Sequence, residues 1–300
     1  VLLVALYTLS EFGAIALLRF DTFTRAIYNP YRGSFDRTSA AALALVLVLI
    51  TLVVIYFARR YRGDRWQAPT SSGRKRRIDL GGGRLFATAG LSVLGLAGAG
   101  IPMASLVGWS LNQIGFDWLR LGELVASSLL VALAAGIWIG VFALAISIWN
   151  LRFQSRFSGA VDVTVWAAHA LPAVVVALAL VFFGANLLPA IYQTIWLLLL
   201  AYLILFLPNA LGLVGTPIAQ VPRSIEEVAR SQGLSKNRAL TKVVLPIAAP
   251  GILAGVALAA LTVLKELPAT LLLRPNNLDT LATELWQETE VLAYTQAAPY

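Results

Sequence analysis

The sequence predicts an all-α polytopic membrane protein that contains a duplicated bundle of transmembrane helices. The chain of 300 residues is 59% hydrophobic and only 13% charged, which is too apolar for an ordinary soluble domain. Its apolar residues gather in stretches of about twenty, the length that crosses a bilayer as a helix. A segment near the start of the chain also resembles a segment near its end.

The apolar stretches predict six full spans and one partial span. Residues 1–18 are expected to be the tail of a span, and residues 19–37 a polar loop. The polar segment 268–300 contains a possible amphipathic helix over 279–291. Because the chain opens in an apolar run and stops without a closing span, we expect a bundle truncated at both ends. The full spans are expected at residues 39–58, 85–109, 124–149, 159–183, 195–214 and 247–267.

Charge on the loops predicts the orientation in the membrane. Of the 23 Lys and Arg residues, 16 fall on loops of one side and 7 on loops of the other, so the first side is expected to be cytoplasmic. That side includes residues 59–84, whose Arg, Gly and Ser content predicts a flexible basic linker. The basic residues lie beside spans rather than on a soluble module, so we expect membrane lipid and no nucleic acid as a partner.

The most polar, best-defined segment in the second half of the chain is the loop 222–246. Ser224 is expected to cap a short helix, with Glu227 three residues later completing a capping box. Gly233 is a natural residue to end that helix. Ser235 is expected to cap a second short helix, which makes a helix, a glycine turn and a helix between two spans.

The spacing in this loop resembles the coupling loop of ABC importer permeases, whose pattern is E-A-A, three residues, G, nine residues, I-x-L-P. Here Val228 stands for the second residue of the pattern and Val243 for its isoleucine. The resemblance implies a cytoplasmic loop that docks on a dimer of ATP-hydrolysing subunits, and a periplasmic substrate-binding protein that delivers the cargo. A basic loop that docks on nothing is the alternative. The docking residues implied by the resemblance are Glu226, Glu227, Ala229, Gly233, Leu245 and Pro246.

An internal repeat indicates that two permease units are joined in one chain. Both copies follow a span and face the less basic side, so the repeat is parallel. It divides the chain into the C-terminal part of a first repeat at 1–58, the linker at 59–84, and a second repeat at 85–300 that lacks its last span. Residues 9–19 align with 264–274, Asp21 with Asp279, and Tyr28 with Trp286.

The double architecture and the run from Lys265 to Pro275 are similar to the ferric-iron branch of ABC importers, over essentially the whole chain. The resemblance implies a multi-pass protein of the bacterial inner membrane that carries ferric iron. Fused thiamine permeases share this architecture, so thiamine or another small solute is the alternative cargo. A secondary transporter is less expected because the span centres are nearly free of charge. A structural scaffold that moves nothing is the third alternative.

Two acids are candidates for the substrate path. Glu11 and Glu266 each lie at the outer end of a span, where an ionisable residue is costly and indicates function. Ferric iron is a hard cation that favours oxygen ligands, and Asp21 and Asp279 are further donors nearby. The alternative for Glu266 is an ion pair with a neighbouring cation, or a helix cap.

The sequence contains no catalytic or nucleotide-binding motif of the phosphate-loop, zinc-protease or nucleophile-elbow type. We therefore expect no enzymatic activity and no cofactor, with ATP hydrolysis in a separate subunit. The absence of cysteine excludes disulfides and thiolate metal sites. The single histidine, His169, is expected to join helices by a hydrogen bond rather than to bind a metal.

Overall fold

The computed structural model describes residues 12–33, 37–62, 81–113, 115–152 and 171–300, and within these ranges every regular element is a helix. The expected all-α membrane protein is confirmed. Among the described residues, two shorter apolar helices, Thr38–Val54 and Ala173–Asn186, accompany four helices that are long and apolar enough to cross a membrane. Those four are Arg84–Leu111, Trp118–Asn150, Ile195–Ala219 and Lys236–Leu264.

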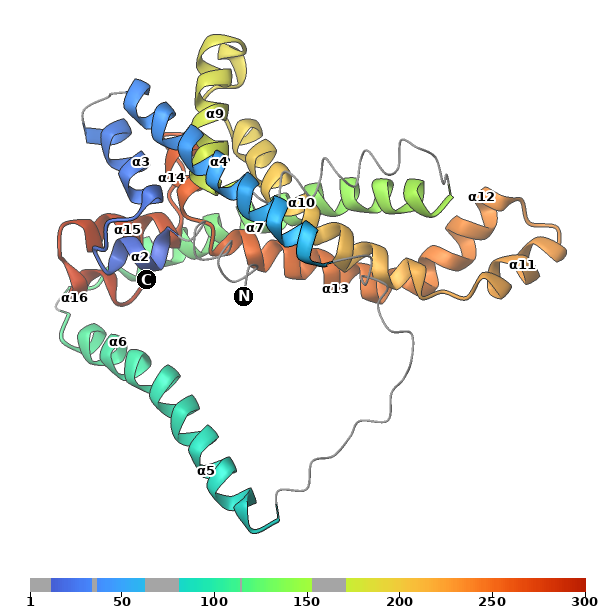
Figure 1. Cartoon of the computed structure of the whole chain (residues 1–300), viewed down its shortest axis with the longest axis horizontal. Helices are drawn as coiled ribbons and strands as arrows, with labels where there is room; N and C mark the ends of the chain where they lie inside the picture. Colours follow the sequence, from blue (N-terminus) through green and yellow to red (C-terminus); the bar gives the residue numbers. More distant parts are fainter. Residues whose placement is uncertain (1–11, 34–36, 63–80, 114, 153–170) are drawn as a thin grey trace.

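Three long helices form the centre of the molecule: α7 (Trp118–Arg152), α10 (Ile195–Ala219) and α13 (Leu245–Leu264). They lie side by side along its longest axis (Figure 1) and pack on one another in all three pairs. α9 (Ala173–Asn186) packs against α10 and against α14 (Pro268–Leu273). The main apolar core lies among these helices and is built largely of alanine, valine and leucine.

Glycines let the three helices approach closely. A Cβ atom added at Gly255 of α13 would lie 2.8 Å from the backbone oxygen of Leu213 in α10. A Cβ at Gly140 of α7 would lie 2.6 Å from a methyl carbon of Val256. Small residues at such contacts allow dispersion contacts between helices in lipid, where water does not drive association.

We expect Gly255→Ala to destabilise the full-length protein, because its new methyl group meets a backbone atom that cannot move alone. Overpacking of this kind costs about 1–3 kcal/mol. Gly212→Ala in α10 is the matched control, because a Cβ there meets nothing within 4 Å. Thermal unfolding in detergent should show a lower midpoint for Gly255→Ala alone. Equal midpoints for the two variants would contradict the close packing.

The N-terminal helices α3 (Phe23–Gly33) and α4 (Arg37–Arg62) pack on the second half of the chain. α3 contacts α4, and both also contact α9. The ring of Phe12 lies 5.2 Å from those of Tyr28 and Trp286, and these two rings are 5.9 Å apart. Trp286 belongs to α15 (Leu281–Glu290), so this aromatic cluster joins the two ends of the chain.

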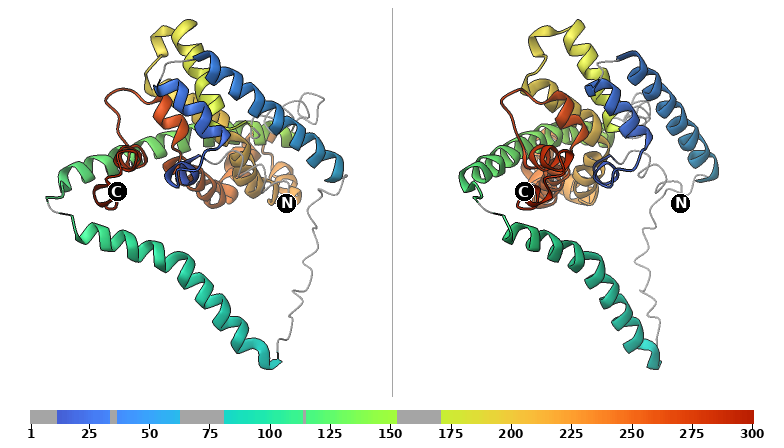
Figure 2. Two further views of the ribbon diagram at one scale, coloured as in Figure 1. Left: turned by 60° about the vertical axis from the view of Figure 1, so that its left-hand side comes forward. Right: turned by 90° about the vertical axis from the view of Figure 1, so that its left-hand side faces the viewer.

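The helix that includes α5 (Arg84–Gly95) and α6 (Ile101–Leu111) stands away from the other spans (Figure 2). None of the residues in its most apolar stretch is buried. It touches the rest of the described structure through a stacked contact between Trp109 and Tyr294, whose ring centroids are 5.8 Å apart. Its apolar surface is therefore available to lipid.

Several predicted spans differ in extent from the helices observed. The helix predicted at 124–149 begins earlier, at Trp118, and the span predicted at 247–267 belongs to a helix that begins at Lys236. Hydropathy marks the edge of the bilayer, whereas a helix continues into water until its backbone is capped. Only the part of the predicted span 159–183 from Ala173 onward appears as a described helix. Residues 63–80 of the predicted linker lie outside the described ranges.

Candidate functional site

Two features lie at opposite ends of the three-helix bundle (Figure 1). At one end, α11 (Arg223–Ser231) and α12 (Lys236–Ala239) form a projecting hairpin, which we call the knob. At the other end, α2 (Gly13–Leu17), α14 and α15 gather around a cavity. The predicted coupling residues lie in or beside the knob, and one of the predicted substrate-path acids lines the cavity.

The start of α11 differs from the prediction. Pro222 occupies the position before the helix, with φ −59° and ψ 135°, and no side chain caps the first turn. Ser224 lies inside the helix, so the predicted capping box with Glu227 is wrong. Proline sets the entry angle through its fixed φ, and this moves the helix start ahead of the serine.

The end of α11 agrees with the prediction. Gly233 has φ +90°, a conformation that residues with a side chain rarely adopt. Its N–H donates to the carbonyl of Arg230 at 3.0 Å, and the N–H of Leu234 donates to the carbonyl of Ala229 at 3.2 Å. Together these bonds form a Schellman motif, which fixes the direction in which the chain leaves the helix.

The knob is packed on one side and open on the other. α11 lies against α12 and the π-helical turn η4 (Leu240–Val244), with Ala229 and Ala239 buried between them. Glu227 is exposed, and the apolar side chain of Val228 is 56% exposed. The small buried side chain of Ala229 thus lets α11 pack closely on α12 and η4, while the preceding residues Glu227 and Val228 face outward.

The remaining predicted coupling residues lie on α11 itself and at the start of α13. Glu226 is half-buried on α11. Leu245 and Pro246 directly follow the π-helical turn η4 inside a continuous helix. Proline has no N–H to donate to the preceding turn, and the altered winding of η4 lies next to it. α12, η4 and α13 follow one another without a break, so the predicted second short helix is the first part of a span-length helix.

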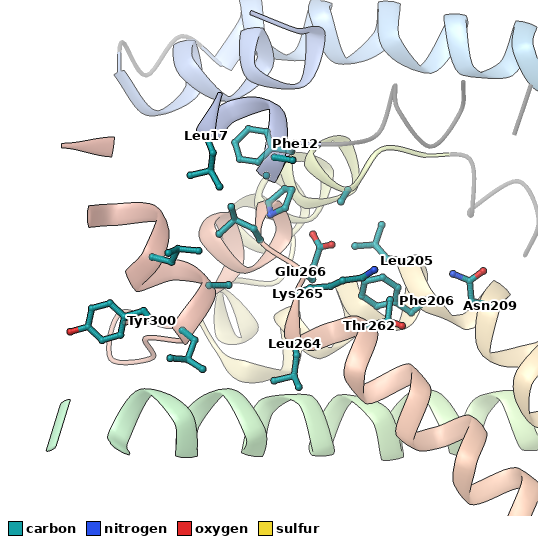
Figure 3. A pocket seen from close by; sticks show the side chains of 18 of the residues that line it. Phe12, Leu17, Leu205, Phe206, Asn209, Thr262, Leu264, Lys265, Glu266 and Tyr300 are labelled. Carbon is teal, nitrogen blue, oxygen red and sulfur yellow. The ribbon is translucent and has the colours of Figure 1, made fainter. Parts of the chain in front are cut away.

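The cavity has a volume of about 800 Å³ and is lined by α2, α10, α15 and the end of α13. Figure 3 shows Lys265 and Glu266 between the side chains of α10 and the ring of Phe12. Asn209 and Thr262 add polar groups to a lining that is otherwise mostly apolar. This size and this mixture suit a small solute.

Glu266 is held in place at the cavity wall. One carboxylate oxygen accepts a hydrogen bond from the N–H of Ala269 at 3.2 Å, in the first turn of α14. The helix-cap alternative for this acid is therefore observed. Glu266 remains a candidate for the substrate path as well, because the same side chain lines the cavity.

Asp279 takes part in a network of ion pairs. Its carboxylate lies 2.7 Å from Arg120 at the start of α7 and also pairs with Arg274, while Glu284 lies 3.1 Å from the same Arg120. Burial raises the pKa of Asp279, but the hydrogen bonds from the two arginines outweigh it, so this pKa lies below its usual value. We conclude that this network ties α7 to the segment before α15.

The other predicted acids are not brought to the cavity by the described structure. Asp21 pairs with Arg25 at 3.3 Å, and its side chain is 91% exposed. Neither Asp21 nor Asp279 is among the residues that line the cavity. Glu11 and His169 lie outside the described residues. Among the residues that are described, no three acids, histidines or cysteines gather in a metal-binding cluster.

Reasoning from the sequence alone does not identify several polar residues of the cavity, among them Asn209, Lys265 and Thr262. Asn209 could have been identified from the sequence, because an amide side chain inside an apolar span usually forms a hydrogen bond to another helix or has a function. Lys265 is adjacent to Glu266, and the sequence suggests for it only a role as an ion-pair partner of that acid. Thr262 carried no signal, because threonine in a membrane helix can satisfy its own backbone, and here it bonds the carbonyl of Leu258 at 2.8 Å.

Comparison with known proteins finds transport permeases. The whole chain aligns, with 31% identity over 309 positions, to 61% of the Fe(3+)-transport system permease protein FbpB 2 of Haemophilus influenzae. About half of the chain, 54%, aligns at 30% identity with 58% of a putative 2-aminoethylphosphonate transport system permease protein, PhnV, of Salmonella typhimurium. A similar share, 49%, aligns at 28% identity with 52% of the diacetylchitobiose uptake system permease protein DasC of Streptomyces coelicolor.

The chain thus spans between half and two thirds of the length of these relatives. Residues 132–296 match the family described as binding-protein-dependent transport system inner membrane component. That match includes most of α7, the knob, α13 and the cavity acid Glu266. It covers more than half of the chain, which therefore belongs to the family of binding-protein-dependent transport system inner membrane components.

Proposed function

We propose that the chain is part of an ATP-driven importer, to which it couples a separate ATPase through the loop 222–246, and that its cargo is ferric iron. The knob is the observation that carries the coupling. Its backbone is fixed by the Schellman motif at Gly233, and its outer face presents the exposed Glu227 and Val228. A loop with this much definition is expected where another protein docks.

The cargo assignment rests on one relative. The relative aligned over the whole chain is named for Fe(3+) transport, while those named for phosphonate and chitobiose align over about half of it. An oxygen-bearing cavity wall with Glu266, Asn209 and Thr262 suits a hard cation. The volume also admits a larger solute, so thiamine or another small solute is the second candidate.

A duplication of the bundle is a further part of this proposal. The alignment of residues 9–19 with 264–274 makes α2 equivalent in sequence to α14. After three inserted residues, it makes α3 equivalent to α15. The paired residues Tyr28 and Trp286 lie in contact. Contacts between equivalent residues are expected where two copies of a unit meet around a twofold axis.

Uptake of radiolabelled ferric iron tests the function. The full-length protein, its ATPase and its binding protein would be placed in proteoliposomes, beside a Glu227→Ala variant. We expect uptake that requires ATP and falls several-fold in the variant. ATP-dependent uptake of thiamine, phosphonate or chitobiose without iron uptake would refute the cargo. Iron uptake indifferent to ATP would refute the ATP-driven importer itself.

A further inference from the structure

A chain of buried hydroxyl groups lies directly behind the cavity acid Glu266. The phenol oxygen of Tyr202 in α10 lies 2.7 Å from the hydroxyl oxygen of Thr270 in α14. The hydroxyl of Thr270 in turn donates to the backbone carbonyl of Glu266 at 2.6 Å. Tyr202 and Thr270 are each only 1% exposed, so both hydroxyl groups have been removed from solvent and depend on these partners.

The direction of the chain follows from the donor inventory. A carbonyl oxygen only accepts hydrogen bonds, so the single hydroxyl proton of Thr270 is committed to Glu266. The proton between Tyr202 and Thr270 must therefore come from Tyr202. Each hydroxyl group in this order donates once, and no buried proton is left without an acceptor.

This chain fixes Glu266 together with bonds from its own turn. The N–H of Glu266 donates to the carbonyl of Val263 at 2.9 Å, and its carboxylate accepts from the N–H of Ala269 at 3.2 Å. Its backbone carbonyl is held by Thr270. The position of the acid thus depends on α13, on α14 and, through Tyr202, on α10.

Tyr202 also contacts a second residue that lines the cavity. Its ring lies 6.2 Å from that of Phe206, one turn further along α10, with the ring planes 31° apart. Phe206 lines the cavity beside Lys265 (Figure 3). One buried tyrosine therefore contacts an aromatic residue of the cavity lining and, through Thr270, the backbone of the cavity acid Glu266.

We propose that Tyr202 and Thr270 are positioning residues for Glu266, which set the affinity of the cavity for its cargo. The proposal rests on the proposed function, in which cargo passes this cavity. The repeat alignment pairs Thr270 with Ile15, which has no hydroxyl group. The second copy of the repeat therefore has a positioning device that this position of the first copy lacks.

Uptake kinetics of the full-length protein with its ATPase and binding protein test the proposal. Tyr202→Phe removes one hydroxyl group and little volume, and Thr270→Val removes the other. We expect each to raise the KM for iron about three- to tenfold, the effect of one hydrogen bond, with little change in maximal rate. Thr270→Ser keeps the hydroxyl group and should restore the wild-type KM.

A double-mutant cycle separates positioning from mere packing. In a Glu266→Gln background, Tyr202→Phe should raise the KM no further, because the group that it positions is already altered. Thr51→Val is the matched control, since the hydroxyl group of Thr51 in α4 is also buried and donates to the carbonyl of Leu47 at 2.9 Å. Its KM should not change.

The outcomes distinguish failure of the proposed cargo path from failure of the proposed positioning role. If Glu266→Gln leaves uptake unchanged, the cavity is not the cargo path and the proposed site fails. If Glu266→Gln raises the KM but Tyr202→Phe and Thr270→Val do not, the positioning role alone is refuted. Fully additive effects in the cycle, or equal loss in Thr51→Val, would likewise refute it.

Discussion

Replacing Gly233 by valine should reduce ATP-coupled uptake at least about tenfold. The residue has φ +90°, where a β-branched side chain is a genuine outlier, and strain of this type costs about 1–3 kcal/mol. A Cβ there meets no atom within 4 Å, so steric overlap is not the cause. The strain would be relieved by opening the Schellman motif, which would turn α11 away from its docking direction.

The loss of coupling in Gly233→Val would be measured by comparing its rate of uptake with the rate of ATP hydrolysis. In proteoliposomes, the ATPase bound to the Gly233→Val permease should hydrolyse ATP without stimulation by the loaded binding protein, while the amount of folded permease stays near that of wild type. Gly233→Asn is the control, because asparagine tolerates positive φ better than other residues with side chains. Normal coupled uptake by the valine variant would show that the turn is not needed for docking.

Replacing Arg120 by alanine should destabilise the full-length protein by about 2 kcal/mol. The change leaves Asp279 with Arg274 as its cation and removes from Glu284 its partner at 3.1 Å. The side chains of Asp279 and Glu284 are only 29% and 15% exposed. Removing one member of a buried pair costs about 3–5 kcal/mol, and the partial exposure of this network lowers that figure.

Thermal unfolding in detergent would measure the loss, with Arg25→Ala beside it. Arg25 also forms an ion pair, but its partner Asp21 is 91% exposed, and exposed pairs contribute about 0–1 kcal/mol. We expect a clear fall in the unfolding midpoint for Arg120→Ala and almost none for Arg25→Ala. Equal shifts would mean that the network does not tie α7 to the segment before α15.

Local chemistry explains which parts of the knob could be predicted. The turn at Gly233 was predictable because positive φ is a property of one residue type. The helix start at Arg223 was not, because Ser224 and Pro222 are both acceptable at a helix start, and only the observed backbone decides between them. The continuous helix from Lys236 was missed because its first two turns are polar and lie beyond the apolar stretch.

The cavity was less predictable because it depends on distances across the fold. Glu266 stood out in the sequence as an acid at the end of a span. Its neighbours Asn209 and Thr262 belong to two different helices, and only the packing of α10 against α13 brings them to one wall. The contact between Tyr28 and Trp286 follows similarly from packing, although the repeat had already paired these residues in sequence.

A single uninterrupted helix connects the knob to the cavity. It runs from Lys236 to Leu264 over 29 residues, about 43 Å at 1.5 Å per residue, and Lys265 and Glu266 follow directly. A tilt of its knob end about a point within the bundle would therefore move Lys265 and Glu266 at the cavity in the opposite direction. The π-helical turn at Leu240–Val244 lies near the knob, where a small change in winding would rotate the rest of the helix and turn Glu266 about the helix axis.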